Sequence, residues 1–137
     1  MKIPFHKPHI TQNEIDSVIE TMQSGWLTMG PKTIEFEIAF KKYIGSQFSI
    51  SVNSATAALH LALNAVGVKK NDEVILPTNT FIATAEAVVY IGAKPILCDI
   101  EANYHNIDIN LIEPLITPKT RAIIPVHLVG IHVIWMK

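Results

Sequence analysis

The first third of the chain carries apolar residues at the spacing of amphipathic helices. One set shares a single helical face: Ile15, Val18, Ile19 and Met22. Thr11 and Glu14 have the spacing of a capping box at the start of this helix, and Gly25 is its expected end. A second helix is predicted over residues 33–43, with Gly45 just past its end.

From residue 48 onward, short apolar segments alternate with segments of helical pattern. The predicted strands are residues 49–52, 73–76, 95–99 and 122–126, and the predicted helices are residues 56–66, 81–91 and 109–115. Asp108 is the expected cap of the last helix. Continuous apolar strands separated by helices predict an α/β fold, with a mostly parallel sheet flanked by helices. Ligands of such sheets bind beyond the carboxyl ends of the strands.

Composition and charge narrow the classes of function. The 137 residues are 49% hydrophobic and 17% charged, which is typical of a domain with a buried core. The net charge of −1, with scattered Lys and Arg, argues against a nucleic-acid or membrane-surface partner. Cys98 is the only cysteine, so we expect no disulfide within the chain and a cytoplasmic location. No signal peptide, membrane span or metal site is expected from the pattern.

Residues 53–63 combine a turn of small polar residues with the start of a helix rich in Ala and Leu. The first N–H groups of a helix lack an internal partner and carry partial positive charge, so this turn is a candidate anion site. Ser54 and Thr56 can add hydroxyl donors. Neither a dinucleotide fingerprint nor a Walker loop is present. The alternative is a capped helix without a ligand, because Ser, Thr and Asn are ordinary caps.

Six segments, in a fixed order and spacing, resemble one known family. They are residues 24–31, 54–60, 67–75, 77–84, 92–95 and 123–128, which include Gly-Trp-Leu-Thr-x-Gly-Pro, Ser-Ala-Thr-Ala-Ala-Leu-His and Pro-Val-His-Leu. The family is the DegT/DnrJ/StrS group of aminotransferases, which depend on pyridoxal phosphate (PLP) and aminate keto sugars attached to nucleotides. The resemblance covers nearly all of residues 3–130. It implies the N-terminal part of the large domain of fold-type I PLP-dependent transferases.

The resemblance also implies roles for single residues in binding the cofactor. Thr56 and Ala57 match residues that hold the phosphate of PLP, which agrees with the candidate anion site. Phe81 matches the aromatic residue that stacks on the pyridine ring, where a flat apolar face would shield the ring from water. From the pattern alone, Phe81 would instead be a buried aromatic residue at the start of a helix.

The substrates and assembly follow from the same resemblance. The intact enzyme would take an amino group, with glutamate as the expected donor, and pass it to a keto sugar on a nucleotide. Three residues match a loop near the sugar-nucleotide site: Trp26, Leu27 and Thr28. From the pattern alone, a Gly-Trp after a helix is a packing corner. The full-length family members are homodimers, so a homodimer is the expected assembly of the intact protein.

The catalytic parts of the family are missing from this chain. A transaminase needs a lysine that forms a Schiff base with the cofactor, and a carboxylate opposite the pyridine nitrogen. Both lie beyond the family's His-Leu-Tyr-Gly motif, which His127 begins here and in which Val129 replaces Tyr. The lysines that match no catalytic position are Lys69, Lys70, Lys94 and Lys119. We therefore expect an inactive fragment. The alternatives are a related PLP-dependent sugar dehydratase, or a complete α/β binding module without catalysis.

The end of the chain departs from the family after Gly130. Residues 131–137 can be written as a set of possible codons. If one base is added before these codons and the reading frame is shifted accordingly, they encode His-Pro-Cys-Asp-Met-Asp-Glu, the continuation expected from the family. We therefore expect three parts: an N-terminal helical segment at residues 1–47, a partial transferase domain at 48–130, and a frameshifted tail at 131–137.

Overall fold

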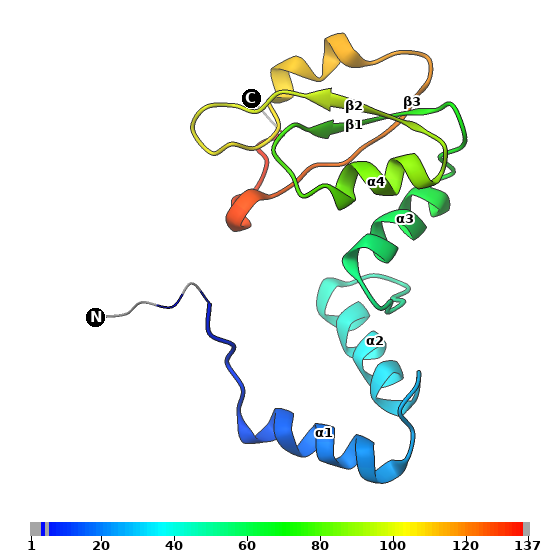
Figure 1. The fold of residues 1–137 in the computed structure, drawn as a ribbon, viewed down its shortest axis with the longest axis vertical. Coiled ribbons are helices and arrows are strands. Elements are labelled where there is room, and N and C mark those ends of the chain that lie inside the picture. The colour runs from blue at the N-terminus through cyan, green and yellow to red at the C-terminus, as the bar shows by residue number, and fades with distance from the viewer. Residues whose placement is uncertain (1–3, 5, 136–137) are drawn as a thin grey trace. The chain divides into compact units, whose positions relative to one another are not determined.

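A computed structural model describes residues 4 and 6–135 of the chain (Figure 1). The chain forms two compact units, residues 1–51 and residues 52–137.

The first unit is built from two helices, α1 (Gln12–Ser24) and α2 (Pro31–Ile44). The predicted capping box is present at the start of α1, where the carboxylate of Glu14 accepts from the Thr11 N–H. Gly25 ends α1 in the left-handed conformation with φ of 73°, which glycine adopts without steric cost. Neither helix buries a residue fully, so the apolar faces that predicted them are largely exposed within this unit.

The predicted strand at residues 49–52 does not form, and this prediction was wrong. The N–H and the hydroxyl of Ser51 both donate to the carboxylate of Glu37 in α2, at 2.7 Å each. Phe48 and Ile50 are each 81% exposed. The alternation of apolar and polar residues favours an extended chain, but a strand also needs a neighbour to pair with, and here a side chain of α2 takes that place.

The second unit contains a parallel sheet of three strands, as predicted. The strands β1 (Glu73–Pro77), β2 (Lys94–Cys98) and β3 (Thr120–Ile123) lie in the order β2-β1-β3. Leu76 of β1 pairs with Leu97 of β2. In Figure 1 the arrows of β1 and β2 point the same way, and the carboxyl ends of the strands meet at one edge of the sheet.

The strand β3 ends earlier than predicted. It stops at Ile123, and the predicted strand end at Val126 was wrong. Pro125 has no N–H to contribute to a strand ladder, which accounts for the early end. His127 therefore lies beyond the strand, where its Nδ1 accepts from the Val133 N–H at 3.1 Å. Val129 has a φ of 49°, an unfavourable left-handed conformation for a β-branched residue.

Two α-helices cover one face of the sheet. These are α3 (Ala55–Ala65) and α4 (Ala83–Tyr90), which contact each other and run side by side in Figure 1. Their buried residues and those of the sheet form one cluster: Leu63, Val68, Val74, Leu76, Ala87, Val88 and Ala93. Because α3 leads into β1 and α4 follows it, both helices run against the strands. Their N-termini therefore lie toward the carboxyl edge of the sheet.

The opposite face of the sheet is covered by shorter elements. The predicted helix at residues 109–115 is two 3-10 turns, η1 (Ile109–Leu111) and η2 (Glu113–Leu115). Pro114 lacks the N–H that a continuous α-helix needs at this point. Asp108 caps the first turn as predicted, by accepting from the Asn110 N–H at 2.9 Å. A second buried cluster lies under these turns: Ile75, Cys98, Ile107, Ile112 and Val133.

The other helix boundaries differ from the predicted ones by one or two residues, within the usual fraying of helix ends. None of the helices in residues 4 and 6–135 is long and apolar enough to span a bilayer.

Candidate functional site

The start of α3 has the geometry of an anion site. Ser54 is the N-cap, and its hydroxyl accepts from the Ala57 N–H at 3.2 Å. The Ser54 carbonyl accepts from the Ala58 N–H at 3.1 Å. No described residue accepts from the N–H of Ala55 or of Thr56. Two backbone donors at the positive end of the helix dipole are thus open for a ligand.

The side chains around these donors also suit a phosphate group. Ala55 and Ala57 are too small to block the approach of a phosphate to the open N–H groups, and Thr56 adds a hydroxyl donor. The first turn of α3 contains no acidic residue, so no carboxylate competes for the donors. The residues present therefore fit the phosphate end of PLP, the part of the cofactor that Thr56 and Ala57 were expected to hold.

Phe81 lies between the end of β1 and the start of α4. Its side chain is 77% exposed, so the alternative of a buried aromatic at a helix start was wrong. The turn that carries it is held by a 2.8 Å hydrogen bond between the hydroxyls of Thr80 and Thr84, the latter buried. Thr56 and Phe81 thus stand at the starts of two contacting helices, on the same edge of the sheet.

The carboxyl edge of the sheet carries an acidic side chain but, among the described residues, no lysine. Asp99 follows β2 and accepts from the Ile100 N–H at 2.8 Å and the Thr78 hydroxyl at 3.3 Å, which joins the ends of β1 and β2. The described lysines of the second unit precede or begin strands, at the opposite edge: Lys69, Lys70, Lys94 and Lys119. No lysine of this unit therefore shares the edge with Thr56 and Phe81.

The loop between α1 and α2 forms a cavity of about 270 Å³ in the first unit. All three residues expected near the sugar nucleotide line it, and Trp26 is 57% exposed. The indole Nε1 of Trp26 donates to the Met29 carbonyl at 2.9 Å. The ammonium of Lys32, also in the cavity wall, lies 3.2 Å from the carboxylate of Glu20. The cavity therefore offers an aromatic face beside charged and hydroxyl groups.

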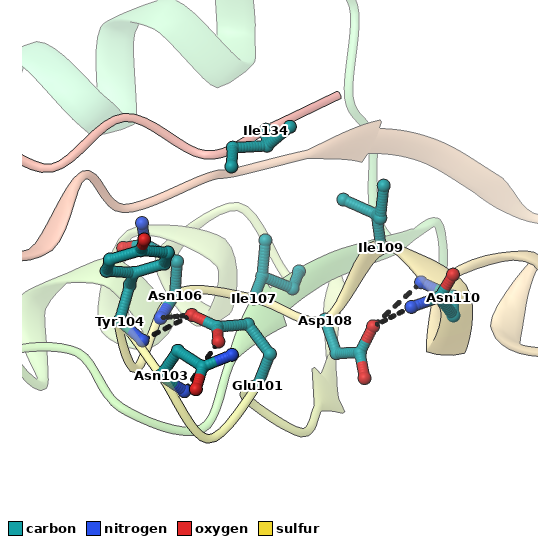
Figure 2. Close-up of a pocket in the computed structure, with 9 residues that line it drawn as sticks. All are labelled: Glu101, Asn103, Tyr104, Asn106, Ile107, Asp108, Ile109, Asn110 and Ile134. Atoms are coloured by element: carbon teal, nitrogen blue, oxygen red, sulfur yellow. Dashed lines mark hydrogen bonds between the residues drawn. The ribbon is translucent and has the colours of Figure 1, made fainter. Parts of the chain in front are cut away.

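A second cavity, of about 200 Å³, lies beside the loop after β2 (Figure 2). Figure 2 shows the Glu101 carboxylate turned back onto its own loop, where it accepts from the N–H groups of Asn103, Tyr104 and Asn106 at 2.7, 2.8 and 3.3 Å. Burial raises the pKa of Glu101, but these three bonds and the charge of His105 together more than offset it, so the pKa is lowered from its ordinary value. The carboxylate is therefore committed to holding the loop.

We expect Glu101 to make the stability of the second unit depend on acid. Its pKa in the folded chain lies below the ordinary glutamate value of 4.5, so its contribution is fully present above that value. The contribution is lost as the pH falls through the lowered pKa. Urea unfolding from neutral pH down to about pH 3 should show the wild-type advantage over Glu101→Gln vanishing in that window.

Glu113→Gln is the matched control for this experiment. The Glu113 side chain is exposed and accepts no hydrogen bond from a described residue. The Glu113→Gln variant should follow the wild type across the whole pH range. If Glu101→Gln does the same, the three hydrogen bonds to the carboxylate contribute no stability.

Cys98, His127 and His132 are each held by neighbouring residues. The Cys98 thiol is 1% exposed, and burial, followed by the charges of Asp108 and Asp99, raises its pKa, so it stays protonated and unreactive. The His127 ring packs edge-on against His132, with ring centroids 5.0 Å apart. Within the described residues, no three His, Cys, Asp or Glu side chains gather closely enough to hold a metal ion.

Comparison with known proteins decides the family. Residues 8–136 match the DegT/DnrJ/EryC1/StrS aminotransferase family. The chain belongs to this family. It is 44% identical to the spore coat polysaccharide biosynthesis protein SpsC of Bacillus subtilis over 128 residues, 93% of the chain and 33% of SpsC. It is 41% identical, over the same shares, to UDP-4-amino-4-deoxy-L-arabinose–oxoglutarate aminotransferase of Shewanella sediminis.

Solved structures of aminotransferases share the fold. Spr1654 from Streptococcus pneumoniae, assigned as a sugar aminotransferase and solved in PLP and pyridoxamine phosphate forms, matches with a TM-score of 0.91 and 44% identity. The match covers 97% of this chain and 34% of that protein. A GDP-4-keto-6-deoxymannose-3-dehydratase matches with a TM-score of 0.87 and 28% identity, over 94% of this chain and 35% of that protein. The fold is therefore that of fold-type I PLP-dependent transferases, and the chain spans about a third of the length of these DegT/DnrJ/EryC1/StrS relatives.

Some residues that shape these sites carry no signal in the sequence. Asn106 is 4% exposed and joins two segments, because its amide donates to the Ile131 carbonyl and accepts from the Leu128 N–H. Nothing in the local pattern distinguishes it from a loop asparagine. Lys32 and Glu20 carry no local signal because they lie twelve positions apart and meet only across the turn between α1 and α2.

Proposed function

We propose that this chain is the N-terminal part of an enzyme that uses PLP to transfer an amino group, from glutamate, to a keto-deoxysugar carried on a nucleotide. The observation that supports the proposal is the start of α3, where the N–H groups of Ala55 and Thr56 have no partner among the described residues and stand beside the Thr56 hydroxyl, in a chain of this family. The glutamate donor is supported by the Shewanella sediminis relative, whose name includes oxoglutarate, the keto acid that glutamate becomes.

The roles of the residues follow from their chemistry. Thr56 would bind the cofactor phosphate through its N–H group and orient it with its hydroxyl, and the open N–H of Ala55 would add a second donor. Ala57, whose N–H already donates to the Ser54 hydroxyl, would contribute a side chain small enough to let the phosphate approach. Phe81 would lie against the pyridine ring and exclude water from one side of it. Bound PLP supplies an electron sink, the chemistry that amino transfer needs. Trp26, Leu27 and Thr28 would contact the sugar nucleotide.

A related dehydratase is the second candidate, and the similarity to GDP-4-keto-6-deoxymannose-3-dehydratase favours it. Both activities would use the same phosphate site, so the start of α3 does not separate them.

We further infer a homodimer in the cytoplasm for the intact protein. The free, buried Cys98 supports a reducing compartment.

Binding of pyridoxamine phosphate tests the phosphate site. This form of the cofactor has no aldehyde, so it forms no adduct with surface lysines. Thr56→Asp should weaken its binding by about tenfold or more, equivalent to ~1.4 kcal/mol, because the new carboxylate repels the phosphate and takes the same N–H groups. An acidic residue in the first turn favours the helix itself, so loss of binding would not reflect loss of α3.

The control adds the same charge elsewhere. The control variant is Asn71→Asp. Asn71 lies before β1, at the opposite edge of the sheet, and its left-handed backbone conformation, with φ of 72°, is tolerated by both Asn and Asp. Equilibrium dialysis should show wild-type affinity for the Asn71→Asp variant. If the Thr56→Asp variant binds pyridoxamine phosphate as tightly as the wild type, the start of α3 is not a phosphate site.

The origin of residues 131–137 stays a prediction. We propose a one-base deletion after the codon of Gly130 in an ancestral aminotransferase gene. The nucleotide sequence from that codon onward should then contain a shifted open frame with a carboxylate strand and a downstream lysine. A shifted frame without that lysine would contradict the proposal.

A further inference from the structure

Gly30 stands at a position where glycine gives the backbone no advantage. It is the N-cap of α2, with φ of −146° and ψ of −161°, an extended conformation that any residue adopts. Ser, Thr, Asp and Asn are preferred at N-caps because their side chains accept from the first turn, and Gly30 provides no such bond. The residue that follows is Pro31, which also favours an extended neighbour. Glycine is itself an accepted N-cap, so the backbone tolerates it here without requiring it, and a further constraint comes from its surroundings.

That constraint is the indole ring of Trp26. A Cβ atom on Gly30 would lie 2.6 Å from Nε1 and 2.9 Å from Cγ of Trp26, and closer still to Cδ1. Gly30 itself is buried, while Trp26 remains 57% exposed. The ring is further held by the 2.9 Å bond from Nε1 to the Met29 carbonyl. The indole thus rests on the glycine with one side open.

We propose that Gly30 is a positioning residue, which by lacking a side chain seats the Trp26 indole as the aromatic wall of the cavity between α1 and α2. This inference rests on the proposed function for its ligand, the sugar nucleotide. An exposed indole suits the apolar face of a sugar ring or a nucleobase, and the polar side chains set into the mainly apolar lining of the same cavity suit hydroxyl groups. The glycine acts only through the tryptophan.

A double-mutant cycle separates this role from simple helix stability. In the 137-residue chain carrying Trp135→Phe, Trp26 is the sole remaining tryptophan. Gly30→Ser should shift the Trp26 emission to the red and increase its quenching by acrylamide, because the ring is displaced into water. It should also lower the thermal midpoint by about 3–6 °C. In a Trp26→Ala chain, the same substitution should leave the midpoint unchanged or raised, because serine is a good N-cap.

Gly45→Ala is the matched control, at the other end of α2. Its φ of 71° makes alanine strained, but a Cβ there meets no atom within 4 Å. The Gly45→Ala variant should lose stability while Trp26 keeps its emission. An unchanged Trp26 emission in the Gly30→Ser variant, or an equal midpoint shift with and without the indole, would overturn the proposal.

Titration with UDP-glucose as the probe separates this proposal from the proposed function. Quenching of Trp26 by the probe should weaken in the Gly30→Ser variant and not in the Gly45→Ala variant. If the cycle shows coupling but the wild-type chain does not respond to the probe, Gly30 still positions Trp26, and the assignment of the cavity to a sugar nucleotide is overturned.

Discussion

The purified 137-residue chain is expected to transfer no amino group from glutamate to a keto-sugar nucleotide, even with PLP in excess. Transamination needs a lysine beside the cofactor. The proposed phosphate site at Thr56 lies toward the carboxyl edge of the sheet, whereas the described lysines of the second unit lie at the amino edge. We expect a complete loss of amino transfer, and not a partial one, because the reactive lysine itself would be missing from the site.

The measurement combines activity with absorbance. A cofactor bound to a lysine at a specific site absorbs visible light, and borohydride removes that absorbance; the wild-type chain should show only the spectrum of free PLP. If the proposed one-base deletion is correct, the control is the longer product made by restoring one base after the Gly130 codon, which should show both activity and the borohydride-sensitive band. Turnover by the 137-residue chain would contradict the placement of its lysines.

Leu76→Ala is expected to destabilise the second unit by about 2–5 kcal/mol, a large part of the stability of a typical domain. Leu76 is 0% exposed and lies at the centre of the cluster between the sheet and the helices α3 and α4. Removing its side chain leaves a cavity that close-packed neighbours fill only in part. Urea unfolding followed by circular dichroism measures the change.

Leu97→Ala is the matched control for this substitution. Leu97 pairs directly with Leu76 on the neighbouring strand and faces the same side of the sheet, yet it is 58% exposed because it belongs to the edge strand β2. Its removal should cost about 0.5 kcal/mol or less. Equal losses at the two positions would mean that α3 and α4 do not cover the sheet as described.

Much of the fold could be predicted because local patterns and tertiary structure agree. The capping box at Thr11 and the cap at Asp108 depend on residues close in sequence, and the structure confirms them. The parallel sheet was predicted from the alternation of apolar segments with helices along the chain, and the structure confirms it for three of the strands. The predicted strand at residues 49–52 failed because strand formation depends on a partner that no local pattern reveals. The predicted end of β3 overlooked Pro125, whose missing N–H was visible in the sequence.

The candidate sites divide in the same way. The candidate anion site at the start of α3 could be proposed from the sequence because a helix start and its small residues are contiguous, and ligand binding there stays a prediction. The seat of Trp26 on Gly30 could not, since an extended glycine before a proline carries no local sign of a ring lying on it. Asn106, buried and bonded to residues more than twenty positions away, likewise emerges only from the folded chain.

Backbone amide NMR of the wild-type chain, titrated with pyridoxamine phosphate, tests most directly whether the start of α3 holds the cofactor phosphate. We predict that the amide signals of Ala55, Thr56 and Ala57 shift most when pyridoxamine phosphate is added. Inorganic phosphate should reproduce these shifts, and pyridoxamine, which lacks the phosphate, should not. If these amides stay unchanged, or if the largest shifts fall at Lys69 and Lys94 on the opposite edge of the sheet, the phosphate site does not exist.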